Sequence, residues 1–173
     1  MVTKLFNKIF KSNKEVSNEM KMSFKEAIRD NDLKKVKYFL NRGVDPSVND
    51  NFAIIKASEK GYLEIVELLL KDYRVDPTLH KNRAIRWASE NGHIEVVKCL
   101  LKDQRVDPTD YRNYSIVSAN YSIVSASDFN HIDIVKLLIS DKRVRNSLLK
   151  EDIIGLIEIE YKLFKLKKWK ETS

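Results

Sequence analysis

The sequence predicts an all-α solenoid, in which about four copies of a two-helix unit stack between helical end caps. The first observation is a repeat: segments that begin with Asp-Pro start at Asp45, Asp76 and Asp107, so the period is 31 residues. The second is that apolar residues recur three and four positions apart in each segment, which is typical of helices with one buried face. Such short helices are not stable alone in water. Neighbouring units must therefore cover one another's apolar faces, as in a solenoid.

The repeat array occupies residues 22–145 and divides into units 22–44, 45–75, 76–106 and 107–145. The second and third units align over their whole length, as DPSVNDNFAIIKASEKGYLEIVELLLKDYRV and DPTLHKNRAIRWASENGHIEVVKCLLKDQRV. The last unit is longer because the heptapeptide NYSIVSA occurs twice in tandem, over residues 113–126. Removing one copy restores the register.

Within each unit we expect a polar turn after Asp-Pro and then two short helices. The first helix carries small and branched apolar residues on one face, such as Ala53, Ile54 and Ala57. It ends where Asn or Gly can adopt a left-handed backbone, at Asn31, Gly61, Gly92 and Asn130. The second helix follows at once. Its predicted buried stripe is Leu63, Val66, Leu69 and Leu70, repeated as Ile94, Val97, Leu100 and Leu101 and as Ile132, Val135, Leu138 and Ile139.

The tandem heptapeptide predicts a first helix lengthened to about residues 113–127. Seven residues make nearly two helical turns, so Ile116 and Ile123 fall on almost the same side. The alternative is that the extra copy bulges out as a loop, because Ser, Val and Ile are mediocre helix formers.

The two ends of the chain are basic, whereas the body is nearly neutral. Residues 1–25 and 161–173 each carry a net charge of +4, and residues 26–160 carry 21 basic against 22 acidic residues. Residues 1–21 predict a basic amphipathic segment or cap, and residues 146–173 predict a capping helix with a basic tail. Ser23 and Glu26 fit a capping box that would start the first repeat helix at Phe24. The alternative is that the basic ends bind a membrane surface or nucleic acid.

The phrases ASEKGYLEIVELLL and ASENGHIEVVKCLL resemble the helix-turn-helix half of the ankyrin repeat. The Asp-Pro start, the AIRWASENGHIEVVK phrasing and the KDQRV tail are similar to ankyrin-repeat proteins of giant DNA viruses of amoebae. This resemblance implies a non-enzymatic module that binds a protein partner, here a viral protein that engages a host protein. The usual Thr-Pro-Leu-His opening is replaced by Phe52–Ile55 and Arg83–Arg86, and the tails KDYRV, KDQRV and SDKRV are longer than the usual loop.

Catalytic and metal-binding motifs are lacking in the sequence. It contains no GxSxG, P-loop, GxGxxG or HExxH pattern. The single cysteine, Cys99, aligns with Leu68 and Leu137, which indicates a buried thiol used as a small hydrophobe. His93 and His131 share the position of Tyr62, which indicates a structural contact, and His80 stands alone in a turn. We therefore expect no catalytic residue, no metal, no cofactor and no small-molecule substrate.

Ankyrin-like arrays bind through a concave face made of turn fingers and first helices, and the resemblance transfers that role to matching positions. The candidate partner-binding residues are Phe52, Lys56, Lys81, Arg83, Arg86, Trp87, Tyr111, Arg112 and Tyr114. Arg and aromatic side chains are enriched at binding hot spots. For Trp87 two interpretations stay open: an exposed contact residue, or a ring that fills a gap between adjacent first helices.

We expect a monomer inside a cell. No apolar run approaches the roughly 20 residues that span a bilayer, and the start of the chain lacks the pattern of a secretory signal. These features indicate the cytoplasm, and the viral resemblance implies that of a host cell.

Overall fold

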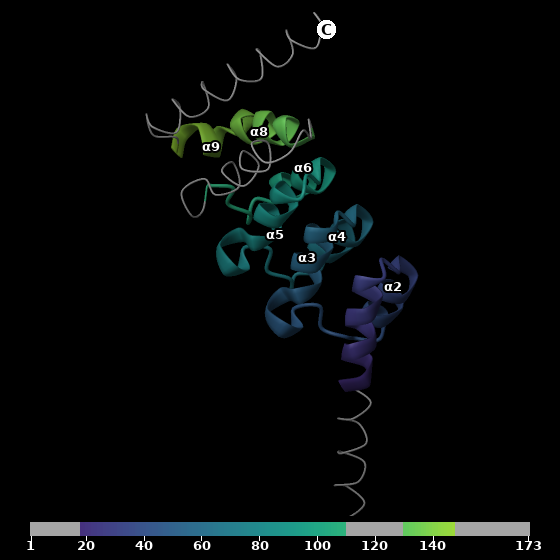
Figure 1. Cartoon of the computed structure of the whole chain (residues 1–173). Coiled ribbons are helices and arrows are strands. Elements are labelled where there is room, and N and C mark those ends of the chain that lie inside the picture. Colours follow the sequence, from purple (N-terminus) through teal and green to yellow (C-terminus); the bar gives the residue numbers. More distant parts are fainter. Residues whose placement is uncertain (1–17, 110–129, 148–173) are drawn as a thin grey trace, which may run out of the picture.

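The computed structural model describes residues 18–109 and 130–147, and within these ranges every regular element is a helix. A helical stretch over residues 18–29 comes first. It is followed by α2 (Leu33–Asn41), α3 (Val48–Lys60), α4 (Leu63–Leu70), α5 (Leu79–Glu90), α6 (Ile94–Lys102), α8 (Asn130–Ser140) and α9 (Lys142–Ser147). Figure 1 shows these helices stacked in chain order along one direction. The predicted all-α solenoid is confirmed.

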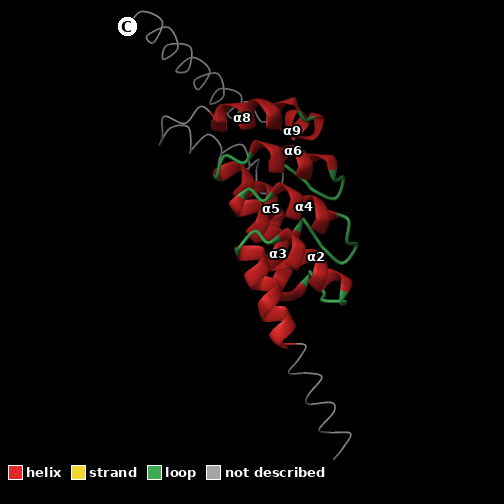
Figure 2. Cartoon of the chain, turned by 90° about the vertical axis from the view of Figure 1, so that its right-hand side faces the viewer, coloured by secondary structure: helices red, strands yellow, loops and turns green. Residues whose placement is uncertain are grey.

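The helices form two layers. The first helix of each unit packs on the second helix of the same unit, as α3 does on α4 and α5 on α6. Each helix also packs on its counterpart in the next unit, α3 on α5 and α4 on α6. Figure 2 shows α3 and α5 in one column and α2, α4 and α6 in the other. We call the first column, together with the helical stretch 18–29, the inner layer, and the second the outer layer.

The left-handed helix ends are confirmed at three of the four predicted positions. Asn31, Gly61 and Gly92 have φ values of 56°, 74° and 77°. The expectation for Asn130 is wrong, because α8 begins at that residue. Asn is also favoured at helix N-termini, where its side chain satisfies a free backbone N–H.

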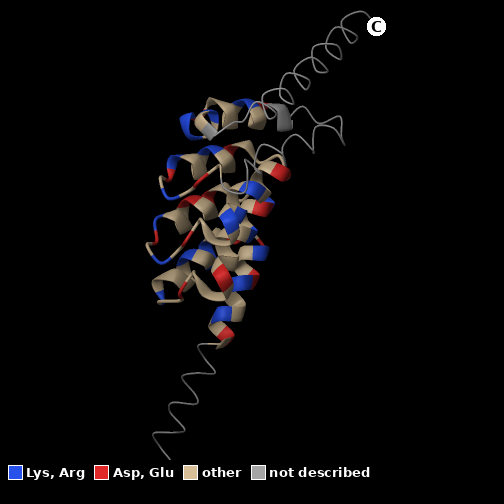
Figure 3. Ribbon diagram, turned by 90° about the vertical axis from the view of Figure 1, so that its left-hand side faces the viewer, with Lys and Arg blue, Asp and Glu red and all other residues tan. Residues whose placement is uncertain are grey.

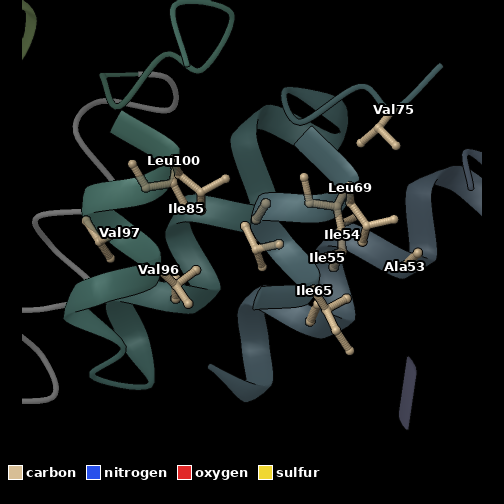
Figure 4. Packing of buried hydrophobic residues seen from close by; sticks show 14 of the residues in the cluster. Ala53, Ile54, Ile55, Ile65, Leu69, Val75, Ile85, Val96, Val97 and Leu100 are labelled. Carbon is tan, nitrogen blue, oxygen red and sulfur yellow. The ribbon is translucent and has the colours of Figure 1, made fainter. Parts of the chain in front are cut away.

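The buried stripe of the second helices is wider than the sequence pattern predicts. In α4, Val66 and Leu69 are fully buried as expected, but Ile65 is fully buried too, whereas Leu63 and Leu70 are only half-buried. The equivalent residues of α6 behave in the same way, with Val96 buried beside Val97 and Leu100. Both α4 and α6 are covered by the inner layer and by a helix on either side, α2 and α6 for α4 and α4 and α8 for α6, so more than one stripe is buried. Figure 4 shows this packing for the second and third units.

Two positions near the ends of the array differ from expectation. Residues 18–29 form one helix, so Ser23 lies inside it and does not cap it, and the predicted boundary between residues 21 and 22 falls within this helix. Half-buried Met20 packs against the core, which extends the helix back beyond Phe24. The last tail forms the short helix α9, because Val144 is followed by Arg145 where Val75 and Val106 are followed by Asp-Pro. The tandem heptapeptide, most of residues 1–21 and residues 148–173 lie outside the described residues.

Backbone and side-chain hydrogen bonds join successive units at equivalent positions. Buried Asn51 accepts a bond of 2.8 Å from the backbone N–H of Asp76, and buried Asn82 accepts one of 2.9 Å from that of Asp107. These amides link one unit to the Asp-Pro start of the next. The Thr-Pro-Leu-His opening is absent from the sequence, and the residue just before it supplies a link between units instead.

The aromatic residue or histidine that starts each second helix reaches the preceding unit. The Tyr62 hydroxyl donates to the carbonyl of Arg29 at 3.2 Å, and His93 Nε2 lies 2.9 Å from the carbonyl of Glu59. Both carbonyls belong to the last turn of an inner helix, where backbone acceptors have no partner inside the helix. The predicted structural role of this position is confirmed for Tyr62 and His93, and His131 lies among residues whose side chains the structure does not describe.

Candidate functional site

A surface hollow of about 310 Å³ lies between the inner helices α3 and α5 and the left-handed turns within their first residues. It is lined by Asn49, Asp50, Phe52, Ile55, Lys56, Glu59, His80, Arg83 and Trp87. We call this the inner groove. It brings together four of the nine residues that the sequence nominates, namely Phe52, Lys56, Arg83 and Trp87.

Cations cover both aromatic rings of the inner groove. The guanidinium of Arg83 lies 5.2 Å from the ring centroid of Trp87. The ring of Phe52 carries the Lys25 amine at 5.6 Å and the Arg29 guanidinium at 5.3 Å. At these distances a cation is attracted to the electron-rich ring face. The groove therefore pairs aromatic with basic groups, and the helical stretch 18–29 adds two cations beside its lining.

Trp87 is half-buried and also lines the inner groove, and its role as a contact residue stays a prediction. Its side chain is half-buried and packs against the core, as a ring between adjacent inner helices should. The same residue lines the inner groove, so part of its surface is available to a partner. Such an anchored aromatic side chain loses little conformational freedom when it is covered, which favours binding.

Two acidic residues balance part of the positive charge. Lys56 Nζ donates to both carboxylate oxygens of Glu59 at 2.9 Å. At the edge of the groove, Asp50 Oδ2 lies 4.0 Å from His80 Nε2, so adjacent turns bring a carboxylate and an imidazole together. Arg83 makes no ion pair within residues 18–109 and 130–147. Figure 3 shows Lys, Arg and acidic residues interspersed along the array.

The turns that carry Asp50 and His80 are three-residue left-handed segments. Asn49, Asp50 and Asn51 have φ values of 55°, 57° and 53°, and the equivalent His80, Lys81 and Asn82 have 55°, 60° and 53°. Such φ values cost energy for residues other than glycine, although Asn and Asp tolerate them best. The buried amide of the third residue, bonded to the next unit, holds each turn in place.

Arg86 supports the groove without lining it. Its Nη1 donates to the carbonyls of His80 and Lys81, both at 3.3 Å, and so braces the left-handed turn at the start of α5. Arg86 is absent from the lining of the hollow, and its nomination as a contact residue stays a prediction. Lys81 is exposed on that turn, beyond the lining of the groove. Tyr111, Arg112 and Tyr114 lie outside the described residues.

Sequence reasoning missed the residues at the edge and the floor of the groove. His80 is not isolated, since it faces Asp50 and lines the hollow together with Asn49, Ile55 and Glu59. The signal was present in the repeat: Asn49 and His80 occupy the same position, three residues before Phe52 and Arg83. The sequence did not predict the left-handed turn that directs these side chains toward the inner layer.

Cys99 lies on the opposite side of the stack, in a second hollow of about 280 Å³ between the outer helices. It is half-buried, which corrects the expectation of a buried thiol, and it still packs against the core. Burial, followed by the nearby charge of Glu67, raises the pKa of the Cys99 thiol above its usual value. A raised pKa disfavours the thiolate, which is the nucleophilic form. This environment suits a packing residue.

No group of three or more His, Cys, Asp or Glu side chains among the described residues could hold a metal ion. In the same part of the chain, none of the helices is both long and apolar enough to cross a bilayer.

Comparison with known proteins identifies the repeat. A family model described as ankyrin repeats, in three copies, matches residues 24–111. This range covers the units 22–44, 45–75 and 76–106 and about half of the chain. Searches of curated proteins and of solved structures returned no match. The stack of paired helices, the 31-residue period and the family match together show that the chain belongs to the ankyrin-repeat family.

Proposed function

We propose that the chain is a non-enzymatic module that binds a protein partner through the inner groove and the adjacent turns. Ankyrin repeats are in general protein interaction modules. The observation that carries the proposal is the hollow between α3 and α5, where Phe52 and Trp87 offer half-buried rings beside Arg83 and Lys56. Partly exposed aromatic and Arg side chains held in a concave, rigid setting are typical of binding hot spots.

The resemblance to proteins of giant amoebal viruses supports a finer proposal about the partner. A viral ankyrin-repeat protein made in an infected cell meets host proteins in the cytoplasm. We therefore place the chain there and propose a host protein as the occupant of the inner groove. The array itself supplies the scaffold, and partner choice depends on the residues that line the groove.

Site-specific photocrosslinking tests the proposal. A benzoylphenylalanine at Phe52 places the reactive ketone in the groove, and the same residue at Tyr73, which is 90% exposed on an outer tail, serves as the matched control. In lysate of an amoebal host, the Phe52 position should give discrete protein adducts and the Tyr73 position should not. Equal adducts from both positions, or none from Phe52, would contradict binding in the groove.

The crosslinking signal should depend on the groove side chains. Arg83→Ala combined with Trp87→Ala removes one aromatic and basic pair, and the adducts at Phe52 should be lost. Arg86→Ala should not replace this double variant, because it also removes the hydrogen bonds that support the turn carrying His80. Circular dichroism of each variant confirms that the helices remain.

The charge at the ends of the chain favours a second candidate function. Residues 1–25 and 161–173 each carry +4, which suits an anionic membrane or a nucleic acid and leaves the array as a spacer. Sedimentation with anionic vesicles and retention on DNA, at low and physiological salt, compares the full chain with residues 22–160. Binding that disappears with the ends supports this candidate, and binding that persists contradicts it.

A further inference from the structure

We propose that the inner groove selects an acidic segment of its partner, extended along the inner layer, with one apolar side chain in the hollow and carboxylates that bind Arg83 and the Lys25–Arg29 pair. This inference rests on the proposed function and adds the chemistry of the partner.

Three cations in or beside the inner groove form no ion pair among the described residues. Lys56 is bonded to Glu59, and His80 faces Asp50. By contrast, Lys25, Arg29 and Arg83 lie over aromatic rings and form no ion pair within the described parts of the chain. The groove therefore presents positive charge at two places, over Phe52 and over Trp87.

Stacking leaves these guanidinium groups able to bind a carboxylate. A cation over a ring uses the face of the guanidinium, whereas its N–H donors lie in the plane and along the edge. Two parallel N–H donors match the two oxygens of a carboxylate and give a strong, charge-assisted pair. The ring also limits the motion of the side chain, so less entropy is lost when the carboxylate binds. Arg29 and Arg83 are thus better placed than Lys25 to donate paired hydrogen bonds to a carboxylate.

The spacing of the two cationic places sets the length of the segment. Arg29 belongs to the helical stretch 18–29 and Arg83 to α5, with α3 between them. Packed helices lie about 8–10 Å apart, so two steps span roughly 16–20 Å. An extended peptide rises about 3.3 Å per residue, so its two carboxylates would be about five or six residues apart. An apolar residue between them then meets Phe52, Ile55 and Trp87 in the hollow.

The same observations disfavour a nucleic acid in the groove. Nucleic-acid bases need free aromatic faces on which to stack, and the faces of Phe52 and Trp87 already carry cations. Asp50 and Glu59 line the hollow, where a continuous phosphate backbone would place negative charge but the proposed peptide places an apolar side chain. Residues 26–160 as a whole carry one more acidic than basic residue, so the array offers no broad basic surface. A short acidic peptide needs only the two local sites.

The test uses the full chain and a phage-displayed library of random dodecapeptides. We expect selected peptides to be enriched in Asp and Glu around an apolar residue. Fluorescence anisotropy then compares the leading peptide with its form in which Asn and Gln replace Asp and Glu, which should bind at least tenfold more weakly. Arg29→Gln and Arg83→Gln should each weaken binding of the acidic peptide about three- to tenfold. Arg83→Lys keeps the charge and should retain more affinity than Arg83→Gln.

Lys98→Gln is the matched control, because Lys98 is an exposed cation of the outer helix α6 and should leave binding unchanged. Selection of neutral or basic peptides, failure to select any peptide, equal binding of the amide form, or displacement of the peptide by single-stranded oligothymidine would each overturn the inference. If photocrosslinking at Phe52 still gives adducts in lysate under any of these outcomes, the groove binds protein and only the inferred acidic character of the partner segment is wrong. If the adducts are absent, the proposed function itself fails.

Discussion

Gly61 lies where two units meet most closely. It ends α3 with φ of +74°, and a Cβ atom built there would stand 2.5 Å from Nδ1 of His93 in the next unit. The His93 ring cannot simply turn away, because its Nε2 is bonded to the Glu59 carbonyl. Glycine is therefore required at this position for two reasons: the backbone is left-handed, and the imidazole fills the space that a Cβ would need.

Substitution of this glycine should separate the two requirements. Gly61→Ala adds left-handed strain of about 1–2 kcal/mol, and the steric conflict with His93 adds to it. Gly43→Ala is the matched control, because Gly43 has φ of +82° with nothing within 4 Å of a Cβ, so only the strain remains. We expect urea unfolding to show a clearly larger loss of stability for Gly61→Ala. Equal losses would show that the His93 contact does not limit the space.

Among the elements, the most regular feature is the Asp-x-Arg-Val tail that follows α4, α6 and α8. Arg105 pairs with Asp103 and donates from Nη1 to the carbonyl of Val75 at 2.9 Å, in the preceding tail. Arg143 does the same with Asp141 and the carbonyl of Val106 at 2.8 Å. These arginines join consecutive tails. The sequence showed the longer tails only as a departure from the ankyrin pattern, and the structure shows what they do.

Removal of one tail arginine should destabilise the array in a pH-dependent way. Arg105→Ala should cost about 1–2 kcal/mol at neutral pH, since its charged hydrogen bonds are partly exposed. The side-chain bond from Arg105 lowers the pKa of Asp103 below its usual 3.8. A carboxylate with a depressed pKa contributes stability above its unfolded value, and that contribution is lost as the pH falls through the folded value. The difference between wild type and variant should therefore shrink below about pH 4.

Chemical unfolding of both proteins between pH 2.5 and pH 7 (roughly the range in which carboxylates titrate) measures this difference. Lys98→Ala breaks the exposed pair with Glu95 and should change stability by less than about 0.5 kcal/mol at any pH. If the loss of stability in Arg105→Ala stays constant down to the lowest pH, Arg105 stabilises the array through its bond to the Val75 carbonyl alone.

Across the whole molecule, helices pack on their own unit and on neighbouring units. For example, α3 packs on α4 and α5, and α6 packs on α4, α5 and α8. Stability of such a stack is close to a sum of unit and interface terms. The inner groove depends on the same arrangement, because α3 and α5 line it from consecutive units.

Deletion of one complete unit should leave a folded array. Removing residues 76–106 joins Val75 to Asp107-Pro108 and keeps the repeat in register. The shortened chain should unfold cooperatively, with a denaturant m-value lower by about a quarter because less surface is buried. Deletion of residues 76–90 alone removes α5 and leaves α6 uncovered, so it should lower cooperativity or unfold the chain. Similar behaviour of the two deletions would argue against a unit-by-unit stack.

Much of the candidate site could be predicted from the repeat. Phe52 and Arg83 share one position of the 31-residue period, and Lys56 and Trp87 share another, so alignment placed all four on the inner face. Arg86 was assigned to the same face, but its side chain braces its own turn. The contacts of a long, flexible side chain depend on which carbonyls lie within reach, and an alignment does not contain that information.

The period of 31 residues and the apolar spacing by themselves determined the paired helices, their left-handed ends at Asn31, Gly61 and Gly92, and the stacking of units. These follow from local backbone preferences and from the need to bury one face of each helix. Only the tertiary structure decided that Asp50 meets His80, that Asn82 holds the next Asp-Pro start, and that Arg105 reaches the preceding tail. Each of these contacts joins residues about one period apart, so it exists only once packing has set the distance between units.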